Sequence, residues 1–182
     1  MPKRLFVACG SVNVISKEQL DFAQEHGFYR MTINPGKHLR EGYLESSAGK
    51  KWINRLKYYY TRERSCILDT TTENIKKMTE GEKQGLKLAR VEVGNLMGKI
   101  MKNLLDCNVD NTVLIVGGDT LLEFFECMHC DEIIPISEIK PGLVLSELYI
   151  ENKKRWVISK SGGFGNKELL VELWDEICSE RI

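Results

Sequence analysis

The chain has 182 residues, of which 42% are hydrophobic and 29% charged, and its formal net charge is +0. This composition is typical of one ordinary globular domain and excludes a disordered chain, and the neutral net charge gives no general attraction to nucleic acid or to a membrane surface. No apolar run approaches the roughly 20 residues that cross a bilayer, and the start has no signal-peptide cleavage pattern, so we expect a cytoplasmic protein.

Short apolar runs alternate with helical patterns along the chain. In order, they predict a strand at 4–9, a helix at 16–26, a strand at 28–33, a helix at 48–60 and a strand at 66–69. There follow a helix at 79–104, a strand at 112–116, a helix at 121–128, strands at 132–136, 143–150 and 156–159, and a helix at 166–177. This alternation favours a single α/β domain over residues 1–182, with three α/β/α layers and a mainly parallel sheet. A hairpin pattern at 147–154 indicates that the edge of the sheet can be antiparallel.

Polar residues and glycines mark the ends and contacts of several helices. Capping-box patterns, in which a hydroxyl residue precedes Glu or Gln by three positions, occur at Ser16–Gln19, Thr79–Glu82 and Thr120–Glu123. Asn166 has the side chain of an ordinary N-cap residue. Gly94 and Gly98 lower the helix propensity of the longest helix, and we interpret them as places where a neighbouring backbone packs closely.

The six cysteines, at 9, 66, 107, 127, 130 and 178, are expected to be reduced thiols in a cytosolic chain. Cys127 and Cys130 alone have a spacing typical of metal ligands, but no second pair completes the four ligands of a structural zinc site. The pair also follows a helical run, whereas a redox CxxC should begin a helix. We therefore interpret it as two small buried side chains.

Three apolar strands end in glycine beside a hydroxyl residue, and each is followed by a helix. These turns are Gly10–Ser11, Gly117–Thr120 and Ser161–Gly165, the last preceded by Lys160. In a parallel sheet they lie at one edge, where glycine lets N–H groups approach an anion and helix N-termini add partial positive charge. Each turn alone has a purely steric explanation, but together they predict a phosphate-bearing ligand. The sequence has neither a P-loop nor a Rossmann fingerprint.

Four motifs in order, GSVNVISKEQL (10–20), VGGDT (116–120), PGLVL (141–145) and KSGGFG (160–165), resemble the C-terminal nucleotide-binding domain of the four-carbon acid sugar kinases. The resemblance runs from residue 6 to residue 167 and implies an ATP site. It implies contacts with the nucleotide from Ser11, Gly117, Gly118, Asp119, Thr120, Lys160, Gly162, Gly163 and Gly165. It also implies Mg²⁺, with Asp119 as a ligand, and transfer of the γ-phosphate to acids such as threonate and erythronate.

The chain departs from the family pattern at three positions. Asn13 stands where serine is usual, Ser16 where threonine is usual, and Gly163 where asparagine is usual. Family kinases also have a separate N-terminal domain that binds the sugar acid, and no such domain is expected in these residues. We therefore expect that domain in cis or as a separate chain, and little activity from this chain alone.

The sequence is also compatible with two other functions. One is a stand-alone nucleotide-sensing or regulatory module without catalysis, which a missing sugar-binding partner would favour. The other is a nucleic-acid surface at 37–64, where basic residues surround Trp52 and three tyrosines. The same pattern describes an amphipathic helix whose long basic side chains cover apolar surface, and the net charge of +0 favours this second interpretation. We expect no nucleic-acid partner.

Overall fold

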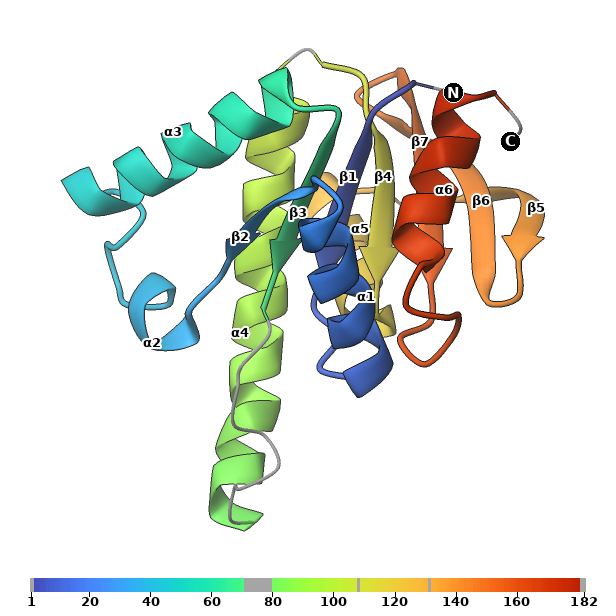
Figure 1. Cartoon of the computed structure of the whole chain (residues 1–182). Helices are drawn as coiled ribbons and strands as arrows, with labels where there is room; N and C mark the ends of the chain where they lie inside the picture. Colours follow the sequence, from blue (N-terminus) through green and yellow to red (C-terminus); the bar gives the residue numbers. More distant parts are fainter. Residues whose placement is uncertain (1, 71–79, 108, 131, 181–182) are drawn as a thin grey trace.

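The computed structural model describes residues 2–70, 80–107, 109–130 and 132–180. Within them, seven strands form one sheet in the order β2-β3-β1-β4-β7-β6-β5 (Figure 1). The strands are β1 (Leu5–Cys9), β2 (Tyr29–Thr32), β3 (Ser65–Asp69), β4 (Thr112–Val116), β5 (Ile134–Lys140), β6 (Leu143–Ile150) and β7 (Lys153–Lys160). The helices are α1 (Val14–Glu25), α2 (Pro35–His38), α3 (Ser47–Arg62), α4 (Glu80–Leu105), α5 (Gly118–Met128) and α6 (Leu169–Cys178).

Five of the strands are parallel and two form an antiparallel edge. β2, β3, β1, β4 and β7 pair in parallel, whereas β6 pairs antiparallel with both β7 and β5. The predicted three-layer α/β/α fold with a mainly parallel sheet is therefore confirmed, and the sheet is mixed. Cys9 aligns with Asp69 and Val116, and Val116 aligns with Lys160, so the carboxyl ends of four strands form one line.

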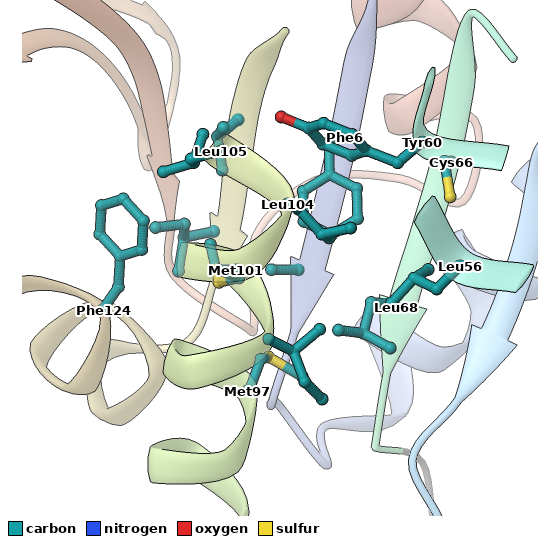
Figure 2. Close-up of a cluster of buried hydrophobic side chains, with 14 of the residues drawn as sticks. Phe6, Leu56, Tyr60, Cys66, Leu68, Met97, Met101, Leu104, Leu105 and Phe124 are labelled. Carbon is teal, nitrogen blue, oxygen red and sulfur yellow. The ribbon is translucent and has the colours of Figure 1, made fainter. Parts of the chain in front are cut away.

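The central strands are buried on both faces, as their continuous apolar sequences require. Alternate residues enter two cores. On one face, Phe6 and Ala8 join residues of α3, α4 and α5, and Figure 2 shows Met97 and Met101 of α4 above β1. On the other face, Leu5, Val7 and Cys9 pack against α1 and α6. No helix in the described part of the chain is long and apolar enough to cross a membrane.

Both glycines of α4 lie in close contact with α5, Gly98 against its backbone, as predicted, and Gly94 against a side chain. A Cβ on Gly94 would lie 2.8 Å from Cγ of Glu123. A Cβ on Gly98 would lie 2.6 Å from Sγ of Cys127 and 2.9 Å from the carbonyl oxygen of Glu123. These separations are shorter than ordinary van der Waals contact, so a larger residue at either position would push the helices apart.

Several predicted helix starts are wrong. Asn13, not Ser16, caps α1, because its Oδ1 accepts the N–H of Ile15 at 2.8 Å. Thr120 lies inside the first turn of α5, which begins at Gly118, and α6 begins at Leu169, three residues after Asn166. Each pattern lies close to the true helix start, but Ser16 and Gln19 form their hydrogen bonds with the distant turn at 162–166. The predicted capping box at Thr79–Glu82 lies outside the described side chains.

The strand predictions differ mainly in length at the antiparallel edge. β5 covers Ile134–Lys140 instead of 132–136, and β7 begins at Lys153 instead of 156. Both extensions carry exposed or charged residues that the apolar pattern excluded, because an edge hairpin does not need a continuous apolar sequence. The one-turn helix α2 (Pro35–His38) was not predicted.

Candidate functional site

The three glycine turns meet at the carboxyl edge of the sheet, beside a change in chain direction. From β1 the chain enters α1, whose buried Leu20 and Ala23 pack on one face of the sheet. From the neighbouring β4 it enters α5, whose Phe124 and Met128 pack on the opposite face. Adjacent strands whose following helices lie on opposite faces form a topological switch point, the place where open α/β sheets bind ligands.

The first turn is packed against the second. The N–H of Gly10 donates to the carbonyl oxygen of Val116 at 3.2 Å. A Cβ on Gly10 would run into Oγ1 of Thr120, which is buried. Gly117 has a φ of +110°, which favours glycine, and a Cβ there would lie 3.5 Å from the backbone nitrogen of Ser11. Ser11 and the Gly117–Thr120 turn are therefore direct neighbours.

The third turn joins the other two. The N–H of Gly117 donates to the carbonyl oxygen of Lys160 at 3.1 Å. A Cβ on Gly162 would run into Oγ of Ser11, so glycine is needed for this approach. Gly165 has a φ of +87°, again in the region that favours glycine. Gly163 is more open, since the nearest atom to a Cβ there would be Nδ2 of Asn13 at 3.8 Å.

Helix α1 holds the third turn through two buried polar side chains that the sequence patterns assigned to a capping box. Ser16 Oγ donates to the carbonyl oxygen of Gly162 at 2.7 Å. Gln19 Nε2 donates to the carbonyl oxygens of Phe164 at 2.9 Å and Asn166 at 2.8 Å. The available signal was two polar residues three positions apart on the face of α1 that carries Leu20, since buried polar side chains need partners.

The turn between β5 and β6 supports the same segment from another side. The N–H of Ser161 donates to the carbonyl oxygen of Gly142 at 3.2 Å. A Cβ on Gly142 would lie 2.6 Å from Cγ of the Phe164 ring, and the φ of Gly142 is +76°. The PGLVL motif therefore contributes Gly142, which packs against the Phe164 ring and binds Ser161 in the third turn.

Lys160 places a buried amine at this edge. Its residue surface is only 3% exposed, and Nζ donates to the carbonyl oxygens of Ser161 at 3.0 Å and Gly162 at 3.4 Å. Burial lowers the pKa of the Lys160 ammonium to about 8. Among the residues that the structure describes, no carboxylate pairs with it. An anion bound nearby would supply the missing counter-charge and raise this pKa.

Several backbone N–H groups at the turns have no acceptor among the residues that the structure describes. Within the described residues, no hydrogen bond uses the N–H of Gly162, Gly163 or Gly165. The first N–H groups of α5, which include that of Asp119, are unpaired in the helix, as at every helix N-terminus. These donors, the partial positive charge of the helix end and the Lys160 ammonium suit an anion with several oxygens.

Two other ionisable groups at this edge have structural roles. Asp69, at the end of β3, is fully buried and accepts from Arg30 Nη2 at 2.6 Å and Thr32 Oγ1 at 2.8 Å. This ion pair joins β2 to β3 and was not expected from the sequence. Cys9, at the end of β1, is buried, and burial raises the pKa of its thiol to about 12, so it is not a thiolate at neutral pH.

Asp119 is exposed at the first turn of α5. In the described part of the chain, no three His, Cys, Asp or Glu side chains come together as a metal site. Among the described residues, Asp119 therefore offers a single carboxylate to a cation, which would share its other coordination positions with a bound molecule and water. Such shared coordination is usual for Mg²⁺ bound with phosphates.

The fold is similar to those of several longer proteins. It matches a domain of unknown function (DUF1537) from Bordetella bronchiseptica, solved with bound citrate as a domain-swapped dimer, with a TM-score of 0.73, 15% identity, and coverage of 96% of this chain and 41% of that chain. A Salmonella typhimurium LT2 structure gives a TM-score of 0.75 and 16% identity over 95% of this chain and 40% of that chain. A DUF1537 protein from Haemophilus influenzae gives a TM-score of 0.69 and 15% identity, and covers 97% and 40%. The chain thus spans about two-fifths of each.

The sequence itself identifies the family. No curated protein matches it, but residues 6–170 match the family model described as a nucleotide-binding C-terminal domain. The matched range contains all three glycine turns, Lys160 and the α1 side chains that hold the third turn. The chain belongs to the family of nucleotide-binding C-terminal domains.

Proposed function

We propose that residues 1–182 form an ATP-binding domain and that the three glycine turns bind the phosphates. The observation that carries this proposal is the set of N–H groups without acceptors at Gly162, Gly163 and Gly165, beside a buried Lys160 that has no carboxylate partner among the described residues. A triphosphate satisfies both the donors and the cation. Membership of a nucleotide-binding family supports the same ligand class.

Each turn has a distinct part in this proposal. Gly117, Gly118 and Thr120 surround the phosphates at the N-terminus of α5, and Ser11 adds a hydroxyl from the first turn. Asp119 supplies one ligand to a Mg²⁺ ion that is otherwise held by phosphate oxygens and water. The metal, when bound, neutralises charge that develops on the transferred phosphoryl group.

We further propose that the reaction is phosphorylation of a four-carbon sugar acid such as threonate or erythronate, with ATP or ADP bound here. This rests on the four-motif resemblance. The acceptor would be bound by a sugar-acid-binding domain, either in cis or as a separate chain. The similar solved proteins are about two and a half times as long as the segment they share with this chain, which supports a further domain in the working enzyme.

A nucleotide-sensing or regulatory module is the alternative. The observation that favours it is the state of Asp69, the buried carboxylate at the same edge. Arg30 and Thr32 both donate to it, so its oxygens are engaged in joining β2 to β3 and are not available to orient a substrate hydroxyl. Adding the sugar-acid-binding domain separates the two functions, because only the kinase then transfers phosphate.

The direct test is calorimetric titration of the chain with ATP and ADP, with and without Mg²⁺. We expect binding of both nucleotides and an increase in melting temperature when nucleotide is added. Lys160→Met removes the buried cation and should weaken binding. Glu18→Gln changes an exposed charge on α1 and should leave it unchanged. Absence of both heat and thermal shift at millimolar nucleotide would contradict the proposal.

A further inference from the structure

Two polar side chains on α1 are buried without capping that helix. Ser16 and Gln19 are each only 1% exposed, and they lie three residues apart on one helix face. Asn13 performs the capping. Burial of a hydroxyl and an amide is costly unless each is hydrogen-bonded, and apolar side chains could fill the same face at lower cost. The polar groups are therefore explained by their partners, which lie in the third glycine turn and, for Ser16, also include Oγ of Ser11 at 3.2 Å.

The partners in the third turn are carbonyl groups whose peptide units carry the unpaired N–H groups. Ser16 Oγ binds the carbonyl of Gly162, which shares a peptide group with the N–H of Gly163. Gln19 Nε2 binds the carbonyl of Phe164, which shares a peptide group with the N–H of Gly165. In a planar trans peptide the C=O and N–H bonds point in opposite directions. Each carbonyl held against α1 therefore turns an N–H away from α1.

The glycines of the third turn explain why its peptide groups need to be held in place. A segment with three glycines in five positions, as in Ser161–Gly165, samples many backbone conformations when nothing restrains it. Donors in a flexible segment lose conformational entropy when they bind a ligand, whereas donors that are already oriented do not. The carbonyl of Gly162 also accepts from Lys160 at 3.4 Å. If an anion draws that ammonium away, Ser16 still satisfies the carbonyl.

We propose that Ser16 and Gln19 are positioning residues for the nucleotide site. They fix the peptide groups at 162–163 and 164–165 so that the N–H groups of Gly163 and Gly165 are oriented as donors to phosphate. This inference rests on the proposed function, because it names what prepares the phosphate site. It assigns neither residue a contact with the nucleotide.

The test follows glycine amides by ¹H–¹⁵N NMR while Mg²⁺–ATP is added, with calorimetry on the same samples. In the unmodified chain the amides of Gly163, Gly165 and Gly118 should shift. Ser16→Ala removes one hydrogen bond to the third turn and Gln19→Met removes two, so each should weaken ATP binding by at least about tenfold, the usual effect of one lost hydrogen bond to a buried acceptor. At saturation the Gly163 or Gly165 shift should shrink while the Gly118 shift persists.

Two matched variants separate positioning from stability. Ser16→Thr keeps the hydroxyl donor and should restore both the affinity and the Gly163 shift. Glu18→Gln, on the exposed face between the two residues, should behave as the unmodified chain. A purely structural role would lower the melting temperature and change all the amides together. If Ser16→Ala does not fold, Gln19→Met and the Gly165 amide provide the same test.

The outcomes distinguish this inference from the proposed function. If the unmodified chain binds ATP and the Ser16→Ala and Gln19→Met variants retain its affinity within about twofold, the positioning role is wrong and the nucleotide site stands. The positioning role is also wrong if the amides of Gly163 and Gly165 shift normally in both variants. If the unmodified chain shows no nucleotide-dependent shift, the proposed function is wrong and the inference falls with it.

Discussion

Oγ1 of Thr120 fills the space that a Cβ on residue 10 would need, so the first and second glycine turns are in direct contact. Gly10→Ala should therefore force these turns apart. We expect it to lower the free energy of unfolding by about 1–3 kcal/mol, the usual cost of overpacking a buried contact. Denaturant unfolding measures this loss. Adding Thr120→Ala removes the colliding atom and should recover most of it, and failure of the double variant to recover would show that another contact excludes the Cβ.

Gly118 differs from Gly10 because no atom lies within 4 Å of a Cβ placed there, and its φ is not positive. Gly118→Val should therefore fold with a free energy of unfolding within about 1 kcal/mol of the unmodified chain. It should nevertheless abolish nucleotide binding, because its side chain would occupy the space of a phosphate at the N-terminus of α5. Calorimetry with ATP measures the loss. Normal binding by this folded variant would remove Gly118 from the proposed site.

The buried amine of Lys160 should make nucleotide binding depend on pH. Its pKa is about 8 without an anion, and a bound phosphate raises it because the charged form is then favoured. Binding near pH 8 should therefore take up a proton, and affinity should fall by up to about tenfold for each pH unit above 8. Calorimetry in buffers of different ionisation enthalpy measures the uptake.

Lys160→Met is the control for that binding experiment and also for the pH dependence of the free energy of unfolding. The folded pKa of Lys160 lies below its ordinary value of 10.5, so the unfolded chain binds more protons between pH 8 and 10.5. This group should therefore make the free energy of unfolding rise with pH across that interval. Lys160→Met should bind ATP more weakly, without the proton uptake, and lack this part of the rise. An identical pH dependence in both proteins would rule out Lys160 as its source.

Cys127 and Cys130 should be dispensable for nucleotide binding. The prediction that both side chains are buried is wrong, since each is only partly buried. Cys127 lies in the last turn of α5 beside Gly98, and Cys130 Sγ lies 3.2 Å from the carbonyl oxygen of Glu132. The double serine variant should keep its fold and its affinity for ATP, with a loss of stability of about 1 kcal/mol from the changed α4–α5 contact. Elemental analysis should find no stoichiometric zinc in the unmodified protein. One zinc per chain would overturn this interpretation.

The isolated chain should have little or no sugar-acid kinase activity. Phosphoryl transfer requires donor, metal and acceptor to be held in line, and the residues proposed here account only for the donor and the metal. Turnover of ATP with threonate or erythronate should stay near background until a sugar-acid-binding domain is added, in cis or as a second chain. Detection of the phosphorylated acid with this chain alone would show that it contains an acceptor site.

Much of the fold was predictable because its local signals agree with its tertiary structure. The parallel strands β1, β3 and β4 are buried throughout, and short apolar runs bounded by polar residues mark such strands. The three glycine turns were also visible, since tight packing between turns or a positive φ favours glycine over residues with a Cβ. A Cβ on Gly10 or Gly162 would run into a side-chain oxygen of Thr120 or Ser11, and Gly117 has a φ of +110°.

The sequence did not predict the partners of polar residues whose short pattern is compatible with either a helix cap or a distant contact. Ser16 and Gln19 fit a capping box, but their partners are carbonyls in the third turn, and a one-dimensional pattern contains no information about a segment so distant. The ion pair of Asp69 with Arg30 was missed for the same reason, because it depends on the pairing of β2 with β3. Local spacing predicts helix faces and turns, but not which distant carbonyl or charge satisfies them.

The hydrogen bonds from α1 to the third turn have a consequence for the order of folding. They join residues 146, 145 and 147 positions apart, whereas β1, β3 and β4 can pair as soon as residue 116 has been synthesised. Contacts between distant segments carry the largest loop-closure entropy and form late. The edge with the three turns is therefore completed only after β7 joins the sheet. A chain that stops before residue 160 would keep most of the core on the α4 face of the sheet but would lack α6 from the other core, and Ser16 and Gln19 would have no partners in the third turn.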